Sequence, residues 1–185
     1  MNPISKMLIG PARRVLLLVA LLMIVAFPCW SQTQTSSQKE DAKYWALSRK
    51  YCNPRFGFCV RYPASLVNDK APENDDGRRF DNGNGLEVTA SGINNAAKDT
   101  LAGEMRSARD GFDRVTYQAK GANWFVLSGL KKGATDAVVY LKTYIGRGSV
   151  NHLEITYPVP LKENYRTVVG NIARSFKPGQ LGVAH

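Results

Sequence analysis

Four strand-like segments follow one another in the second half of this chain, and this order constrains the fold more than any other feature. They are rich in apolar and β-branched residues, and turn-forming residues separate them. Because consecutive strands with short connections pair antiparallel, the order predicts an antiparallel sheet. The four segments are residues 114–119, 124–130, 138–145 and 150–157.

Two amphipathic helices are predicted beside this sheet. Asp99 or Thr100 can cap the first helix, whose apolar residues recur at helical spacing up to Phe112. The second helix spans about residues 161–176 and carries a complete apolar stripe, and Lys177-Pro178-Gly179 ends it. Since both stripes must be buried, we predict an α+β domain with two helices packed on an antiparallel sheet of about six to seven strands.

The first half of the domain supplies the remaining strands. Residues 58–62 and 86–90 read as strands, and a long polar loop at 68–85 lies between them. A short strand around residues 78–81 interrupts this loop. We predict one domain over residues 50–177, preceded by a flexible or partly helical segment at 32–49 and followed by a C-terminal tail at 178–185.

An apolar run near the N-terminus predicts export. Residues 15–27 are apolar, follow Arg13-Arg14, and are fewer than the roughly 20 residues that span a bilayer. We expect a signal peptide at 1–31, cleaved after Ser31, and therefore a periplasmic or secreted protein. Lipidation of Cys29, or a segment kept as a membrane anchor, are the alternatives.

The charge balance of the exported part is basic. Removing residues 1–31 leaves 154 of the 185 residues, with 22 basic and 15 acidic side chains and a net charge of +7. This charge has two interpretations: a basic surface that only keeps the protein soluble, or attraction to an anionic partner such as an acidic protein, an envelope polymer or a membrane surface. No nucleic-acid motif occurs, and nucleic acid is not expected as a partner of an exported protein.

Two cysteines lie in the predicted domain, and their spacing indicates their role. Six residues separate Cys52 from Cys59, whereas a redox motif has two residues between its cysteines. A zinc site would need two further ligands, and the chain has only two histidines, His152 and His185. A strand, a turn and a strand closed by a disulfide explain the pair best, in an oxidising compartment.

Three short motifs carry a family resemblance over roughly residues 50–177. Residues 56–63 (FGFCVRYP), 74–80 (NDDGRRF) and 151–158 (NHLEITYP) resemble the PsbP-like fold. Photosystem extrinsic subunits, Mog-type Ran-binding proteins and the bacterial lipoprotein DcrB share this fold, as do small exported bacterial proteins of unknown function. The resemblance implies α/β/α layers, and binding or scaffolding more than catalysis. The cysteine pair is a departure from the family pattern.

No catalytic, cofactor or metal site is predicted. The acidic loop 73–81 does not follow the calcium-loop pattern, because Gly83 stands where that pattern needs glutamate. His152 lies two residues from Glu154 on one strand face, which could form a base and its orienting partner. An envelope enzyme using this histidine or the acidic loop is the alternative function.

The function expected from the sequence is that of an exported, non-catalytic binding or accessory protein of the bacterial cell envelope. Its partner would be an envelope protein or an anionic envelope component. A secreted inhibitor or immunity protein that inserts loop 68–85 into its partner is a further alternative. The residues expected to contact the partner are Arg78, Arg79, Asp75 and Asp76 in this loop, and Trp45 before the domain.

Overall fold

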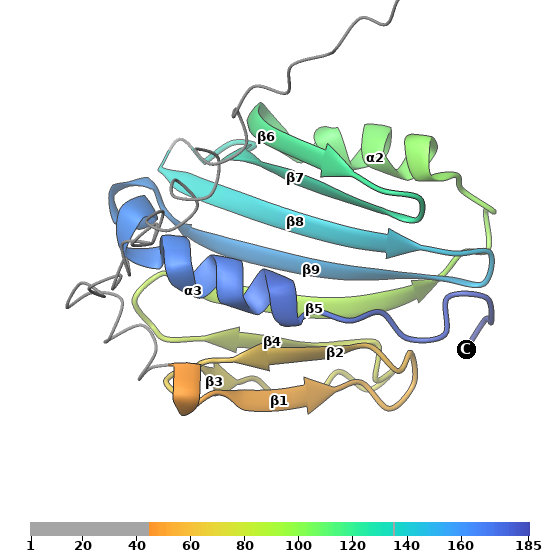
Figure 1. Cartoon of the computed structure of the whole chain (residues 1–185), viewed down its shortest axis with the longest axis horizontal. Helices are drawn as coiled ribbons and strands as arrows, with labels where there is room; N and C mark the ends of the chain where they lie inside the picture. The colour runs from red at the N-terminus through yellow and green to blue at the C-terminus, as the bar shows by residue number, and fades with distance from the viewer. Residues whose placement is uncertain (1–44, 135) are drawn as a thin grey trace, which may run out of the picture. The chain divides into compact units, whose positions relative to one another are not determined.

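The computed structural model describes residues 45–134 and 136–185, so the predicted signal peptide and most of segment 32–49 lie outside the described residues. The described part contains a seven-stranded sheet in the order β3-β4-β5-β9-β8-β7-β6 and a separate β1–β2 hairpin (Figure 1). The strands are β1 (Arg49–Cys52), β2 (Cys59–Tyr62), β3 (Val67–Asn68), β4 (Gly77–Asp81), β5 (Glu87–Asn94), β6 (Phe112–Lys120), β7 (Trp124–Lys131), β8 (Ala137–Ile145) and β9 (Ser149–Pro158). The helices are α2 (Leu101–Arg109), the 3₁₀ turn η1 (Val159–Leu161) and α3 (Lys162–Ser175).

The larger sheet is antiparallel throughout, which confirms the predicted α+β class. Strands β6 to β9 form a meander, in which each strand pairs with the next along the chain. Strand β5 then pairs with β9 and places β4 and β3 beyond it. The order follows from the sequence pattern, since short turns connect the four C-terminal strands and leave β9 with one free edge for β5.

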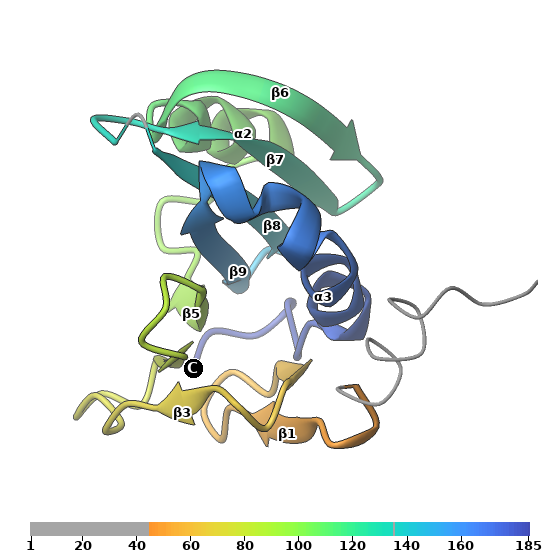
Figure 2. The same ribbon diagram turned by 90° about the vertical axis from the view of Figure 1, so that its left-hand side faces the viewer.

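The two helices cover opposite faces of this sheet. Successive residues of a strand point to opposite faces. Leu153 and Ile155 of β9 join the hydrophobic core with Ile172 of α3. His152, which directly precedes Leu153 and therefore points to the other face, lies 4.0 Å from Glu104 of α2. The arrangement is the α/β/α layering that the sequence predicts (Figure 2).

The predicted apolar stripe of α3 is confirmed as core. Val169, Ile172 and Ala173 are buried, and Phe176 directly after the helix is fully buried. The β1–β2 hairpin covers the same core beside α3, where the rings of Phe58 and Phe176 meet edge to face. Helix α3 and the hairpin therefore form one layer over one face of the sheet.

Helix α2 differs from the prediction. Thr100 caps it as expected, because its Oγ1 accepts a hydrogen bond of 3.1 Å from the Gly103 amide. The helix ends at Arg109, however, and Phe112 begins β6 instead of extending the apolar stripe. No residue of α2 is fully buried. The reason is its position over β6 and β7, where strand β6 forms the edge of the sheet.

Residues 178–185, predicted as a tail outside the domain, pack against it. The Gly179 amide donates to Asn151 Oδ1 at 3.0 Å, and the Leu181 carbonyl accepts from the Gly148 amide at 2.9 Å. A Cβ at Gly179 would lie 1.8 Å from the Phe56 carbonyl oxygen, so only glycine fits this crossing. The segment stays close to the domain because backbone groups of the β8–β9 turn bond to it.

The predicted disulfide joins Cys52 to Cys59 across the β1–β2 hairpin. The turn between the strands is built by Asn53, whose Oδ1 accepts from the backbone amides of Arg55 and Phe56 at 3.0 and 2.6 Å. Gly57 provides the left-handed backbone that the turn needs. The hairpin is thus fixed by a covalent bond and by local hydrogen bonds.

Replacement of Cys52 by serine should destabilise the protein. Without the disulfide, the unfolded chain regains the conformational freedom that the closed loop had removed. For a loop of this length, this lowers the free energy of unfolding by about 2.5 kcal/mol. Urea unfolding of the Cys52→Ser and wild-type proteins would measure the difference. Thiol labelling of the native wild-type protein should leave Cys52 and Cys59 unmodified, and modification of both would contradict the disulfide.

Replacement of Val169 by aspartate should unfold the domain. This side chain is 6% exposed inside the α3 layer, and an unpaired buried charge there would cost about 4 kcal/mol or more. Circular dichroism and thermal melting would report the loss. The matched Lys162→Ala change at the exposed start of α3 should alter the melting temperature little. A normally melting Val169→Asp protein would refute the assigned core.

Candidate functional site

A groove of about 660 Å³ lies between the β1–β2 hairpin and the end of α3. Basic side chains from three segments line it, together with one tryptophan and one amide side chain, and no carboxylate lines it. We call this feature the basic groove. Its polar and aromatic lining residues are Trp45, Lys50, Arg61, Asn171, Arg174 and Lys177.

The hairpin directs two of these cations outward. Val60 and Tyr62 of β2 are buried, so the alternate residue Arg61 faces away from the core. The register places Lys50 of β1 directly opposite Arg61. Like charges in this position repel each other and are unfavourable in an antiparallel pair.

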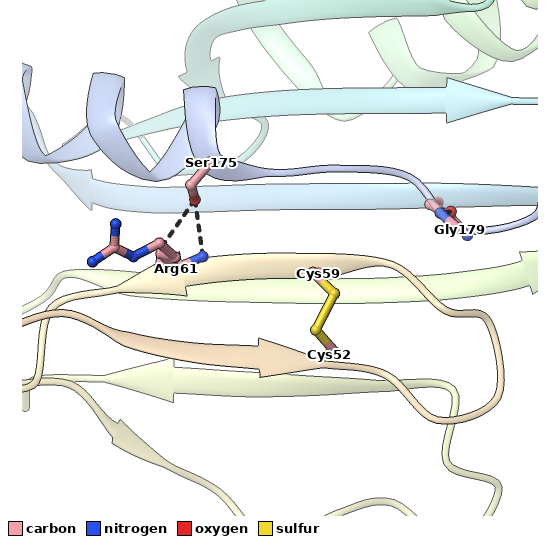
Figure 3. Close-up of a disulfide and its surroundings, with 6 residues drawn as sticks. Cys52, Cys59, Arg61, Ser175 and Gly179 are labelled. Atoms are coloured by element: carbon pink, nitrogen blue, oxygen red, sulfur yellow. Dashed lines mark hydrogen bonds between the residues drawn. A yellow bond between two sulfur atoms is a disulfide. The ribbon is translucent and has the colours of Figure 1, made fainter.

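The last turn of α3 carries Arg174 to the same place, and the segment after the helix carries Lys177 there. Its backbone pairs with β2 at Cys59, where Cys59 and Lys177 exchange hydrogen bonds of 3.0 and 2.9 Å. The Ser175 Oγ accepts from the Arg61 amide at 2.9 Å and lies 3.2 Å from the Arg61 carbonyl oxygen (Figure 3). These bonds occupy the edge of β2 that borders the groove and hold Arg174 and Lys177 close to Arg61.

The tryptophan predicted as a contact residue belongs to this groove. The Arg61 guanidinium lies 5.3 Å from the centre of the Trp45 ring, in a cation–π contact. The Arg174 guanidinium donates to the side chain of Asn171. Both arginines therefore have neutral partners, which keep their positive charge available.

No salt bridge neutralises the four cations within residues 45–134 and 136–185. Basic residues near the end of a helix can serve to balance its C-terminal carbonyls. Arg174 lies in the last turn of α3, but the direct hydrogen bond to a terminal carbonyl comes from Lys142 of β8, whose Nζ donates to the Ala173 carbonyl at 3.0 Å. The exposed cations of the groove thus remain without a counter-charge in the described part of the chain.

The arginines predicted in loop 68–85 have a different environment. Arg79 lies in β4 and forms ion pairs with Glu87 at 2.7 Å, Asp69 at 3.0 Å and Asp81 at 3.9 Å. Hydrogen bonds to Glu87 and Asp69 raise the pKa of Arg79 further above its ordinary value. Arg78 donates to the Asp69 carbonyl and lies 5.5 Å from the Tyr51 ring centre.

The two aspartates of this loop also have local partners. The Asp75 carbonyl accepts from Asn53 Nδ2 at 2.8 Å, and Asp76 Oδ2 accepts from Asn74 Nδ2 at 2.8 Å. The described residues contain no group of three or more side chains suited to hold a metal ion. The loop's role in partner contact stays a prediction.

His152 has a different partner from the one predicted. It faces Glu104 of α2, with 4.0 Å between Nε2 and Oε1, and its Nδ1 lies 3.0 Å from Thr143 Oγ1. Glu154 instead pairs with Lys131 at 3.7 Å. Burial lowers the pKa of His152 to about 4, and burial, then Asp99, raises the pKa of Glu104. A neutral imidazole beneath α2 is what this environment favours near pH 7.

Sequence reasoning missed the basic groove as a whole. Its cations are separated along the chain, and no motif links positions 50 and 61 to positions 174 and 177. One available signal was Arg61, a charged residue in a strand whose neighbours are apolar. That residue had to face solvent, but its companions depend on how α3 crosses the hairpin.

Comparisons with known proteins identify the fold. Neither a protein-family model nor a curated protein sequence matches this chain. The solution structure of cyanobacterial PsbP (CyanoP) from Synechocystis sp. PCC 6803 has a TM-score of 0.51 and 14% sequence identity, covering 72% of this chain and 93% of that chain. The fold is PsbP-like. A crystal structure from Bacteroides thetaiotaomicron has a TM-score of 0.48 and 14% identity, covering 72% of this chain and 49% of the other.

The PsbP-like resemblance predicted from the sequence is thus confirmed for the fold. An identity of 14% carries no site residue from one protein to the other. No helix among the described residues is long and apolar enough to cross a membrane.

Acid should destabilise this PsbP-like domain through His152. Its pKa is 6.5 in the unfolded chain and about 4 in the fold, so the unfolded chain binds the proton first. The free energy of unfolding is therefore highest above pH 6.5. It decreases by about 3 kcal/mol in all as the pH falls from 6.5 toward 4. The raised pKa of Glu104 offsets part of this loss, because protonation of that carboxyl favours the fold.

Urea unfolding between pH 7 and pH 4 would measure this dependence. The His152→Gln variant cannot titrate at this position, so its stability should change less with pH than that of the wild type. Equal pH dependence of the two proteins would contradict the buried neutral state of His152.

Proposed function

We propose that this chain is an exported, non-catalytic binding or accessory protein of the bacterial cell envelope, and that it holds an anionic partner in the basic groove. The observation that carries the proposal is the gathering of four cations around one groove that no carboxylate lines. The opposed pair Lys50 and Arg61 repel each other, and a bound anion would remove this repulsion.

Location in an oxidising compartment is supported by the Cys52–Cys59 disulfide. Cleavage of a signal peptide after Ser31 would deliver the domain to the periplasm or the exterior. In that setting the available anions are acidic proteins, polymers and lipid headgroups of the envelope. The exposed guanidinium groups of Arg61 and Arg174 suit such groups, because their planar donors fit carboxylates and phosphates.

Binding is favoured over catalysis by the state of the one candidate base. The side chains of His152 and Glu104 are only 20% and 19% exposed where α2 meets the sheet. The Nδ1 atom of His152 is hydrogen-bonded to the Thr143 hydroxyl. The groove contains no histidine, cysteine thiol or carboxylate that could act as a nucleophile or base, since Cys59 is in the disulfide.

Neutralising the groove should weaken capture of the partner. The exported protein, immobilised, would be exposed to envelope extract and compared with the Arg61→Ala/Arg174→Ala double variant. Loss of two charge contacts should lower the apparent affinity about tenfold or more, without a change in melting temperature. An Arg106→Ala/Lys162→Ala variant removes the same charge from exposed positions elsewhere and should bind as the wild type.

Two further variants separate the alternatives. If Arg78→Ala/Arg79→Ala abolishes capture while the groove variant retains it, the contact surface is loop 68–85 and the groove assignment is wrong. A turnover activity that His152→Gln removes would instead establish an enzyme.

A further inference from the structure

We infer that the basic groove is a docking site for an anionic phospholipid bilayer, with the cations on lipid phosphates and the turn at Trp45 and Leu47 in the interfacial layer. This inference rests on the proposed function of the groove as an anion site and names the anion. It depends on the charge of the groove, on the exposed Leu47 two residues after the groove-lining Trp45, and on the occupied edge of β2.

The charge of the groove suits a layer of phosphates. Lys50, Arg61, Arg174 and Lys177 are all exposed, so their heads can reach a surface outside the groove. Basic residues close to an anionic bilayer each add to binding, and they need no fixed geometry among themselves. A surface with many mobile phosphates can therefore satisfy all four cations together.

An exposed aliphatic side chain close in sequence to the groove favours a bilayer over a soluble anion. Leu47 is 67% exposed and stands two residues after Trp45, in a turn closed by the hydrogen bond from the Ser48 amide to the Trp45 carbonyl at 3.0 Å. Trp45 itself is half-buried and lines the groove. Tryptophan, an exposed aliphatic residue and long basic side chains on one surface are the combination found at membrane interfaces.

The principal rival is an acidic peptide, and the backbone beside the groove disfavours it. An extended peptide gains much of its affinity by adding to the free edge of a strand. The edge of β2 that borders the groove is not free, because Cys59 pairs with Lys177 and the Arg61 backbone bonds to Ser175. A peptide could therefore bind only to the side chains of the groove. Its acidic groups would make no favourable contact with the apolar side chain of Leu47.

Sedimentation with lipid vesicles tests the inference. The exported protein would be mixed with vesicles of phosphatidylcholine alone, or of phosphatidylcholine with one-third phosphatidylglycerol, at low and high salt. Binding should require the anionic lipid and should weaken as salt is added. Because each interfacial cation contributes roughly fivefold, Arg61→Ala/Arg174→Ala should lower the partition coefficient about 25-fold.

Two controls make the result specific. Arg106→Ala/Lys162→Ala should bind vesicles as the wild type does, since these exposed residues lie outside the groove. Leu47→Ser should weaken vesicle binding severalfold and leave binding of soluble polyglutamate unchanged. All variants keep the same N-terminal residues, so any contribution from those residues is equal in every comparison.

The outcomes separate this inference from the proposed function. Equal binding to neutral and anionic vesicles, or anionic binding that the groove variant retains, would overturn lipid docking. Polyglutamate binding that the groove variant loses, without vesicle binding, would also overturn it while preserving the groove as an anion site. If the groove variant matches the wild type in vesicle binding, polyglutamate binding and capture from envelope extract, both proposals fail.

Discussion

The short backbone pairing between Cys59 and Lys177 is the constraint on which the rest of this structure depends. It joins the first hairpin of the domain to the segment that leaves the last helix. Together with the Ser175 bonds to Arg61, it sets the end of α3 against β2 and closes the core layer around Phe58 and Phe176. The groove forms at this junction because side chains that cannot enter the core point outward from both segments.

Basic side chains have different surroundings in the main sheet and in the β1–β2 hairpin. In the main sheet, Arg79 is surrounded by three carboxylates from β4, β5 and the residue after β3, so its charge is balanced within the fold. At the hairpin, Lys50 and Arg61 stand opposite each other without such balance in the described residues. The ion pairs of Arg79 fix local structure, whereas the like charges of Lys50 and Arg61 lower the stability of the fold. An external anion bound between Lys50 and Arg61 would remove this repulsion.

Local sequence patterns explain why the fold could be predicted. The meander from β6 to β9 and the stripe of α3 are set by residues that are close in the chain, such as Val169, Ile172 and Phe176. The Cys52–Cys59 disulfide was likewise predictable, because a hairpin brings both cysteines together. The length of α2 was not, since Phe112 fits a helical stripe and an edge strand equally well.

The candidate site could be predicted only in part. Trp45 was predicted as a contact residue from its position before the domain, but Arg61 and Arg174, which line the same groove, meet only after α3 has crossed the hairpin. The sequence offered Glu154 as a possible partner of His152, whereas Glu104 faces it from helix α2 and not from its own strand. Periodicity assigns a residue to a face, but tertiary packing decides what stands opposite it.

The late pairing of β2 also determines when the chain can become native. The hairpin that starts the domain has its inner edge completed by residues near the C-terminal end of the sequence, and residues 178–185 then bond to the β8–β9 turn. Contacts this distant in sequence form slowly, because the intervening chain must first lose its conformational freedom. They cannot form before the residues that follow α3 have been synthesised. The topology therefore delays native packing of the first hairpin until almost all of residues 45–185 are available.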